Sequence, residues 1–304
     1  MTTRQVEHEY TIGAPAATVY RLLADVSHWP QIFPPTIHVE RQATGAHQER
    51  IHIWATANGQ AKNWTSRRTL DPEALRIDSA SEVTTAPVAA MGGTWIVEPL
   101  GADSSRIRLL HDSGPSPRPQ DLQWIDRAVD TTRHLELAAL ATTSNHAHAA
   151  EERELLSFTD TCTIDGAAKD VFDFVNEADR WPERLPHVAT VRFEEPAPGL
   201  QILEMDTRAK DGSVHTTKSY RVALDTRKIA YKQVTLPALM TLHTGVWTFT
   251  RRPGHHRGEL AAHRLHQHAN IAKIPRRAGQ VADARDYVHS ALSTNSRAPW
   301  ASQG

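Results

Sequence analysis

The sequence has little cysteine, no excess charge and no long apolar run. Each of these absences excludes some classes of protein. Cys162 is the only cysteine, so we expect no intramolecular disulfide and no cysteine-based metal site; beside Ile164 it reads as packing. No apolar run could span a bilayer and no secretory leader is apparent, which predicts a soluble, cytoplasmic protein with no membrane partner. The formal net charge of −1 argues against nucleic acid as a partner.

What the chain does contain is an internal repeat. Its 304 residues, 39% of them hydrophobic, suffice for two ordinary domains. An offset of 152 positions relates these pairs: Ile12 and Ile164, Trp29 and Trp181, Pro34 and Pro186, Trp95 and Trp247, His111 and His263. A repeat this long indicates a duplicated domain rather than a solenoid. We predict one domain at residues 1–146 and a second, more divergent one at 147–304.

Within one unit the pattern predicts an α+β domain. A strand at 5–12 precedes a helix that starts at Ala14-Pro15. Trp29-Pro30 is predicted to end that helix, because a residue before proline avoids helical geometry, and to start a short second turn or helix to Phe33. Turn signals, including Asn58-Gly59, separate further candidate strands. These lie at 37–44, 49–57, 60–70, 76–84, 94–99 and 106–111. The expected result is an antiparallel meander.

A long helix at about 120–143 is predicted to close this sheet over a cavity. Its apolar stripe would consist of Leu122, Ile125, Val129, Thr132, Leu135 and Ala139. The second half repeats the order, with Asp211-Gly212 as the matching hairpin and a final helix near 278–296.

Strand alternation singles out one set of polar side chains. Trp64, Ser66 and Arg68 share one face of the strand at 60–70, whereas Arg67 lies on the other. Counted from the two hairpins, Ser66 falls on Ser219 and Arg68 on Arg221, both with an offset of 153. An indole, a hydroxyl and a guanidinium together suit an amphiphilic pocket. The competing interpretation is an ordinary solvated surface arginine.

Three stretches resemble the polyketide aromatase/cyclases of bacterial type II polyketide synthases, within the START/Bet v 1-like helix-grip superfamily. They are Trp29-Pro30-Gln31-Ile32-Phe33-Pro34, Trp64-Thr65-Ser66-Arg67-Arg68 with Leu70-Asp71, and Met91-Gly92-Gly93-Thr94-Trp95. The first half resembles the family better than the second, and the duplication resembles the two-domain members associated with ketoreduced polyketides. We therefore expect the first domain to hold the better-formed site.

The resemblance implies two tandem helix-grip domains, each a curved antiparallel sheet around a long C-terminal helix with an internal pocket. It implies first-ring cyclisation and dehydration of a poly-β-ketone carried on an acyl carrier protein, with other synthase subunits as further partners. It implies no metal and no organic cofactor. A non-catalytic carrier of hydrophobic ligands is the alternative, because such pockets serve binding as readily as catalysis.

Within that family a pocket arginine, a histidine and an acid are associated with enolisation and loss of water. Arg68 would stabilise an enolate oxygen, and His111, at the end of an alternating inward series, would move protons. Asp130 or Asp126 would supply the acid, and Arg221 and His263 would repeat the set. The competing interpretation of each histidine is a hydrogen-bonded structural group, and that of each acid is a solvent-exposed helical carboxylate.

Aromatic and sulfur side chains would line the pockets, although core packing is their default role. The candidates, together with Ser66 and Ser219, are Trp29, Phe33, Trp64, Met91, Trp95, Trp181, Met240 and Trp247. A histidine-rich stretch invites a zinc interpretation, but its spacing matches no strong ligand pattern. Its members are His255, His256, His263, His266 and His268.

Overall fold

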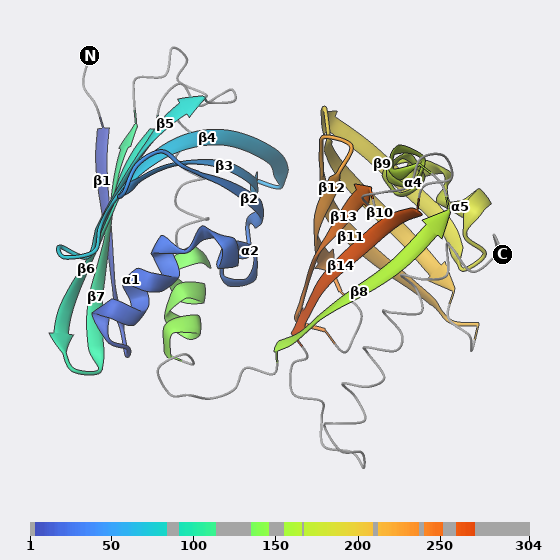
Figure 1. Ribbon diagram of the computed structural model, residues 1–304. Helices are drawn as coiled ribbons and strands as arrows, with labels where there is room; N and C mark the ends of the chain where they lie inside the picture. The colour runs from blue at the N-terminus through green and yellow to red at the C-terminus, as the bar shows by residue number, and fades with distance from the viewer. Residues whose placement is uncertain are drawn as a thin grey trace. The chain divides into compact units, whose positions relative to one another are not determined.

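The chain forms two compact units, Met1–Glu152 and Arg153–Gly304. The computed structural model describes residues 4–83, 91–113, 135–145, 155–165, 167–208, 212–236, 240–251 and 260–270. Each unit contains a seven-stranded antiparallel sheet (Figure 1). The predicted boundary after residue 146 lies outside the described residues and stays a prediction.

The first unit is a meander whose first strand pairs with its last. Strand β1 (Arg4–Ile12) leads into helix α1 (Ala16–Ala24), the short 3-10 helix η1 (Val26–His28) and α2 (Trp29–Ile32). Six further strands follow: β2 (Thr36–Ala43), β3 (Gln48–Ala57), β4 (Gln60–Asp71), β5 (Arg76–Val83), β6 (Met91–Gly101) and β7 (Ser104–Ser113). Their spatial order is β1-β7-β6-β5-β4-β3-β2, which confirms the predicted antiparallel arrangement.

The hairpin between β3 and β4 fixes the register of the strands that matter most for the site. Asn58 (φ 49) and Gly59 (φ 75) both have positive φ, as a two-residue turn between right-twisted strands requires. Because Ala57 then pairs with Gln60, Glu49 lies directly opposite Arg68. Directly opposed residues in an antiparallel pair project from the same face.

The first helix ends earlier than predicted, but the short second helix predicted from Trp29-Pro30 to Phe33 is confirmed as α2. Helix α1 ends at Ala24, and the chain turns at Asp25 (φ −85, ψ 92), whose carboxylate accepts hydrogen bonds from the backbone N–H and hydroxyl of Ser27. Trp29 itself is helical (φ −56, ψ −39), and Pro30 lies in the first turn of α2. Proline is tolerated there because the first N–H groups of a helix have no partner within it.

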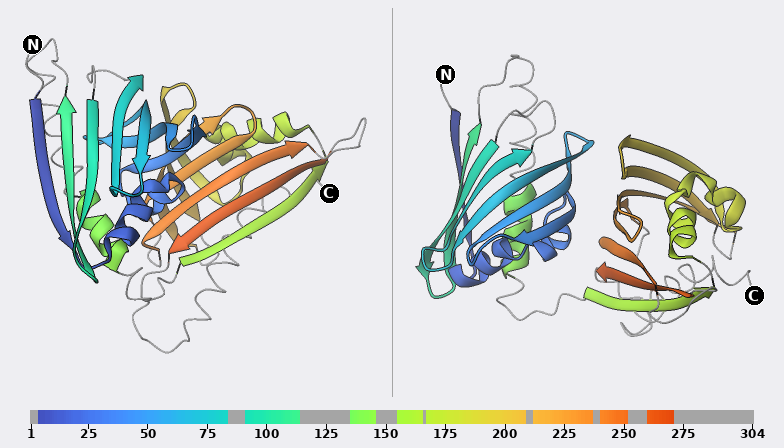
Figure 2. Two further views of the ribbon diagram at one scale, coloured as in Figure 1. Left: turned by 60° about the vertical axis from the view of Figure 1, so that its left-hand side comes forward. Right: turned by 45° about the horizontal axis from the view of Figure 1, so that its top comes forward.

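The core of the first unit lies between the sheet, α1 and the helix at residues 135–145, which occupy the same concave side of the sheet in Figures 1 and 2. Leu23 of α1 and Leu137, Leu140 and Ala141 of the second helix are buried in one cluster. The predicted stripe is wrong in this segment, because Leu135 is 50% exposed. The buried face begins two residues later, and residues 120–134 lie outside the described part.

The second unit repeats this architecture, as the offset of 152 predicts. It comprises β8 (Leu155–Asp165), α4 (Ala168–Asn176), η2 (Ala178–Arg180), α5 (Trp181–Arg184), β9 (Val188–Ala197), β10 (Leu200–Arg208), β11 (Val214–Leu224), β12 (Lys228–Thr235), β13 (Leu242–Arg251) and β14 (Leu260–Asn270). Its strand order, β8-β14-β13-β12-β11-β10-β9, matches that of the first unit. The predicted final helix near 278–296 lies outside the described residues.

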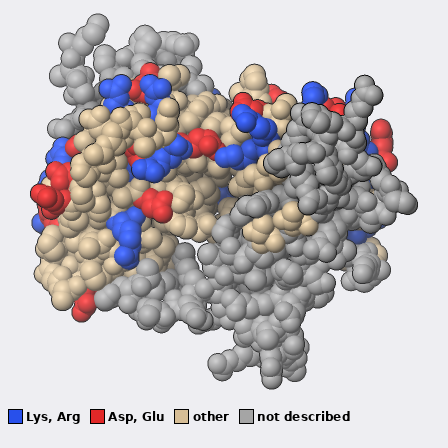
Figure 3. All heavy atoms as spheres, in the orientation of Figure 1, with Lys and Arg blue, Asp and Glu red and all other residues tan. Residues whose placement is uncertain are grey.

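Two surface properties bear on function. No described helix is long and apolar enough to cross a membrane. On the face seen in Figure 3, acidic and basic side chains are interspersed rather than gathered by sign. The described residues on that face form no continuous basic stripe of the kind that nucleic acid selects.

Candidate active site

The alternation predicted for β4 is confirmed. Ser66 is buried and Arg68 is only 2% exposed, so both lie on the core side of the sheet. The side chain of Arg67 is 63% exposed and forms an ion pair with Glu82 at 2.5 Å. Two adjacent arginines therefore have opposite environments, and only Arg68 belongs to the interior.

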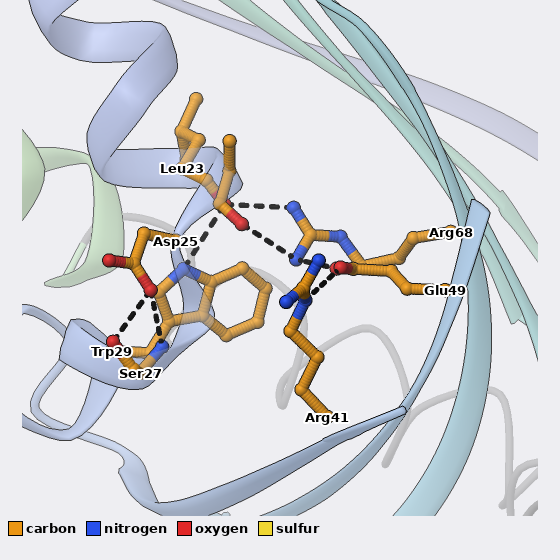
Figure 4. A network of polar contacts seen from close by, with 8 residues as sticks. Leu23, Asp25, Ser27, Trp29, Arg41, Glu49 and Arg68 are labelled. Carbon is orange, nitrogen blue, oxygen red and sulfur yellow. Dashed lines mark hydrogen bonds and ion pairs between the residues drawn. The ribbon is translucent and has the colours of Figure 1, made fainter. Parts of the chain in front are cut away.

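Arg68 lies in a cradle made by three elements (Figure 4). Its Nη1 donates to Glu49 Oε1 of β3 at 2.9 Å and to the Ala24 carbonyl at 3.4 Å, and its Nη2 donates to the Leu23 carbonyl at 2.8 Å. The guanidinium carbon lies 5.0 Å from the centroid of the Trp29 ring. The last carbonyls of α1 have no partner within the helix, and this cation satisfies two of them.

The charge of Arg68 is compensated inside the protein. Burial lowers the pKa of Arg68 to about 10, and the neighbouring Glu49 opposes that shift. At neutral pH the side chain therefore remains cationic. Glu49, itself 1% exposed, also forms an ion pair with Arg41. The cation is thus held in place, and its field on a ligand is reduced by its own counter-ion.

The second unit repeats the cradle around Arg221, which is 4% exposed. Its Nη2 donates to the Val175 carbonyl at 2.5 Å, and its guanidinium carbon lies 5.1 Å from the centroid of the Trp181 ring. Val175 ends the counterpart of α1, and Trp181 is the repeat of Trp29. Burial lowers the pKa of Arg221 to about 10. The sequence-based pairing of Arg68 with Arg221 thus corresponds to equivalent positions in the two units.

The cradles differ at one position. Gln201 replaces Glu49 as the cross-strand partner, since Gln201 lies directly opposite Arg221. Its Nε2 donates to Asn176 Oδ1 at 2.9 Å. Within the described part of the chain, neither Gln201 Oε1 nor Arg221 Nη1 has a hydrogen-bond partner. The second cation therefore lacks the carboxylate that neutralises the first.

His111 lies on the same row of the first sheet as Arg68. Arg68 pairs with Ser79, Ser79 with Gly93, and Gly93 with His111. A Cβ on Gly93 would lie 3.5 Å from His111 Nδ1, so the ring lies beside this glycine. Three strand spacings separate the backbones of the two residues by about 14 Å. They are too far apart for a direct hydrogen bond and could contact only different parts of one extended ligand.

The register does not make His263 the counterpart of His111. The corresponding row in the second unit runs from Arg221 through Tyr231 and Gly245 to Gln267. His263 instead pairs with Phe249. The connection between β13 and β14 is longer than that between β6 and β7, so a constant offset through the sequence slips by four positions across this hairpin. The apparent repeat of the histidine is therefore a coincidence of numbering.

The sequence analysis missed a polar network in the second unit. The hydroxyl of Tyr231 lies 3.1 Å from His243 Nε2, and His243 Nδ1 lies 2.7 Å from Gln233 Oε1. Burial lowers the pKa of His243 to about 4, so its ring is neutral at physiological pH. A Cβ on Gly245 would lie 2.5 Å from the Tyr231 hydroxyl, so Tyr231 can lie across β13 only because residue 245 is glycine.

The repeat contained a signal for this network. Tyr231 and His243 stand 152 positions after Ser79 and Met91, so each unit carries different chemistry at equivalent places. A comparison of what differs between the repeats, rather than what they share, would have identified both residues.

Most predicted pocket aromatics also pack in the cores. Phe33 is buried and lies edge-on to Trp29, with ring centroids 5.4 Å apart. The other tryptophans pack against hydrophobic clusters while remaining partly exposed. Trp29, Trp64 and Trp95 do so in the first unit, and Trp181 and Trp247 in the second. Ser219 and Met240 are partly exposed as well. Their contact with a ligand stays a prediction.

Several predicted residues lie outside the described parts. Asp126 and Asp130 are among them, and so are His255 and His256. For Met91, His263, His266 and His268 only the backbone is described.

Comparison with known proteins places this architecture in a family. Residues 12–124 match the family model described as polyketide cyclase/dehydrase and lipid transport. The granaticin polyketide synthase bifunctional cyclase/dehydratase of Streptomyces violaceoruber is 39% identical over 302 residues, which cover 98% of this chain and 92% of that protein. The chain belongs to the polyketide cyclase/dehydratase family. It is accordingly a cyclase/dehydratase enzyme.

Further relatives agree over the full length of this cyclase/dehydratase. The actinorhodin polyketide synthase bifunctional cyclase/dehydratase of Streptomyces coelicolor is 36% identical over 304 residues, 97% of this chain and 94% of that protein. The crystal structure of the di-domain ARO/CYC BexL, from the BE-7585A biosynthetic pathway, is 54% identical with a TM-score of 0.82, covering 97% of this chain and 96% of that one.

The crystal structure of the di-domain ARO/CYC StfQ, from the steffimycin biosynthetic pathway, is 31% identical with a TM-score of 0.83. The match covers 97% of this chain and 95% of StfQ. The predicted tandem helix-grip fold is confirmed.

Proposed function

We propose that this cyclase/dehydratase is an aromatase/cyclase that closes and dehydrates the first ring of a ketoreduced poly-β-ketone bound to an acyl carrier protein. The observation that carries the proposal is the duplicated inward-facing arginine, stacked on a tryptophan in each unit. The names of the full-length relatives support a polyketide synthase context. The acyl carrier protein would deliver the chain, and other synthase subunits would be further partners.

Ring closure requires an enolate carbon to attack a carbonyl carbon of the same chain. The new C–C bond leaves an alkoxide that takes up a proton, and loss of the hydroxyl as water with a proton from the neighbouring carbon then forms a C=C bond. Arg68 would donate a hydrogen bond to the enolate or carbonyl oxygen, since a guanidinium stays charged throughout. His111 would move protons further along the chain.

The spacing of these two groups fits an extended substrate. A row about 14 Å long between Arg68 and His111 suits a chain with several oxygens better than a compact molecule. The interior row would hold the chain so that one carbon and one carbonyl lie close enough to react. Asp130 would complete the proton-transfer set, with the partly exposed tryptophans as walls.

The experiment is a reconstituted synthase assayed with wild-type protein, with Arg68→Gln and without the protein. We expect wild type to direct one ring pattern and the variant to release the shunt products seen without protein. Ligand affinity of the variant separates the two functions: lost product control with retained affinity supports the enzyme. A profile that is the same with and without wild-type protein would leave only the carrier function.

A further inference from the structure

The second unit contains a buried cation whose charge no described side chain compensates. Arg221 of β11 is enclosed by Trp181, the end of α4 and Gln201 of β10. The groups that act on its pKa are burial and the neighbouring Tyr231. In the first unit the carboxylate of Glu49 acts on Arg68 as well, and it opposes the effect of burial on the pKa of that arginine.

Two orphaned atoms lie at this position. Arg221 Nη1 is a donor and Gln201 Oε1 is an acceptor, and among the described residues neither has a hydrogen-bond partner. They belong to directly opposed residues, whose Cβ atoms are about 5 Å apart in an antiparallel pair. Buried polar atoms in native proteins are nearly always paired, so an unpaired donor and an unpaired acceptor on opposed residues point to a ligand.

Gln201 is held away from the cation by a second difference between the repeats. Its amide donates to Asn176, and the equivalent of Asn176 in the first unit is Ala24, which has no side-chain acceptor. The second unit therefore has Gln201 at the position of Glu49 and Asn176 at the position of Ala24. The pair Gln201 and Asn176 leaves the guanidinium without an internal partner, whereas Glu49 occupies the equivalent nitrogen of Arg68.

A neutral glutamine does not offset a buried positive charge, but an anionic oxygen from a ligand would. A ligand with a hydroxyl next to that oxygen would also donate to Gln201 Oε1. His243, which lies 3.1 Å from the Tyr231 hydroxyl, adds no positive charge at neutral pH, because burial lowers its pKa to about 4. A carboxylate or an enolate therefore meets an unopposed cation.

We propose that the second unit is a binding site for an anionic oxygen, held by Arg221 Nη1, and that Gln201 is the residue that determines this preference for charge. In the first unit Glu49 occupies Nη1 of the equivalent arginine, so that site favours an uncharged carbonyl. The inference rests on the proposed function only for naming the anion as part of a polyketide. The first unit would thus bind an uncharged oxygen of the polyketide, and the second unit an anionic one.

The test measures binding of benzoate and of benzamide, a neutral molecule of the same shape, to the full-length protein by calorimetry at pH 7. We expect wild type to prefer benzoate by about tenfold, because a charge-assisted hydrogen bond is roughly twice as strong as a neutral one. Gln201→Glu should abolish the preference, since its carboxylate would occupy Nη1 as Glu49 does in the first unit. Arg221→Gln should abolish it by removing the cation.

Arg227→Gln is the matched control, because Arg227 is an exposed arginine in the turn after β11, paired with Asp225. It should keep the preference for benzoate. Equal binding of the two probes to wild type, or an undiminished preference in Arg221→Gln, would overturn the inference. The readout needs no synthase, so failure of the proposed cyclisation assay would be a separate result.

Discussion

At the scale of single residues, the environment of each arginine determines what it can do. Arg67 and Arg68 are adjacent, yet one forms an exposed ion pair with Glu82 and the other is 2% exposed and paired with Glu49. Alternation along β4 predicts which of them lies inside. The sequence analysis did not predict the buried partner, although the Asn58-Gly59 turn contains the information, because a two-residue hairpin fixes every later pair, including Glu49 with Arg68.

Removing the buried carboxylate should destabilise the first unit. Glu49→Gln leaves Arg68 as a buried charge without a counter-ion, and we expect a loss of about 3 kcal/mol in the free energy of unfolding. Hydrogen exchange of the β3 and β4 amides at pH 7 measures it. The control is Glu82→Gln on the exposed face, which should leave exchange nearly unchanged. Equal protection in both variants would mean that the buried ion pair does not stabilise the sheet.

At the scale of elements, the network of Tyr231, His243 and Gln233 joins β12 to β13 and predicts a pH dependence. Burial depresses the pKa of His243 to about 4, below its ordinary 6.5, so the unfolded chain binds the proton first as the pH falls. Titration of His243 therefore leaves the stability of the second unit unchanged above about pH 6.5, whereas Lys232, whose pKa burial lowers to about 7, acts at higher pH. That stability should fall by about 3 kcal/mol between pH 6.5 and 4.

Urea unfolding at a series of pH values measures this loss, with hydrogen exchange in β12 and β13 assigning the transition to the second unit. His243→Gln keeps a polar side chain without the titration and should flatten the slope. His187 is also shifted downward by burial, so the difference between variant and wild type, rather than the total slope, isolates His243. An unchanged slope would contradict a neutral buried imidazole. Exposed His215→Gln is the control.

Periodicity predicts elements well and their connections less well. The strands alternate around a buried row, so their positions could be read from the sequence to within a few residues. The helix face was misplaced because it was extrapolated from Leu122, whereas Leu137, Leu140 and Ala141 are the residues that reach the core. The histidines were misassigned because the connection between β13 and β14 is longer than that between β6 and β7. The pairing register shifts by four positions, so Gln267, not His263, lies on the row of Arg221.

At the scale of the whole molecule, duplication has produced two interiors with different chemistry. The first row carries a neutralised arginine, a serine, a glycine and His111. The second carries an uncompensated arginine, Tyr231, a glycine and Gln267. Within these rows a histidine that could transfer protons occurs only in the first unit. The proposed cyclisation and dehydration should therefore depend on His111 for proton transfer and on Arg221 for holding charge.

The two roles can be separated kinetically in the full-length protein. His111→Gln places in the first row the residue that the second row already has, and it should lower kcat by about 10²-fold, the usual contribution of a general acid or base, with little change in KM. Arg221→Gln should instead raise KM, because it removes a contact to the bound chain. Exposed His215→Gln should match wild type in both constants. If His111→Gln turned over at the wild-type rate, proton transfer would have to come from another group, and the row on the first sheet would serve only to position the chain.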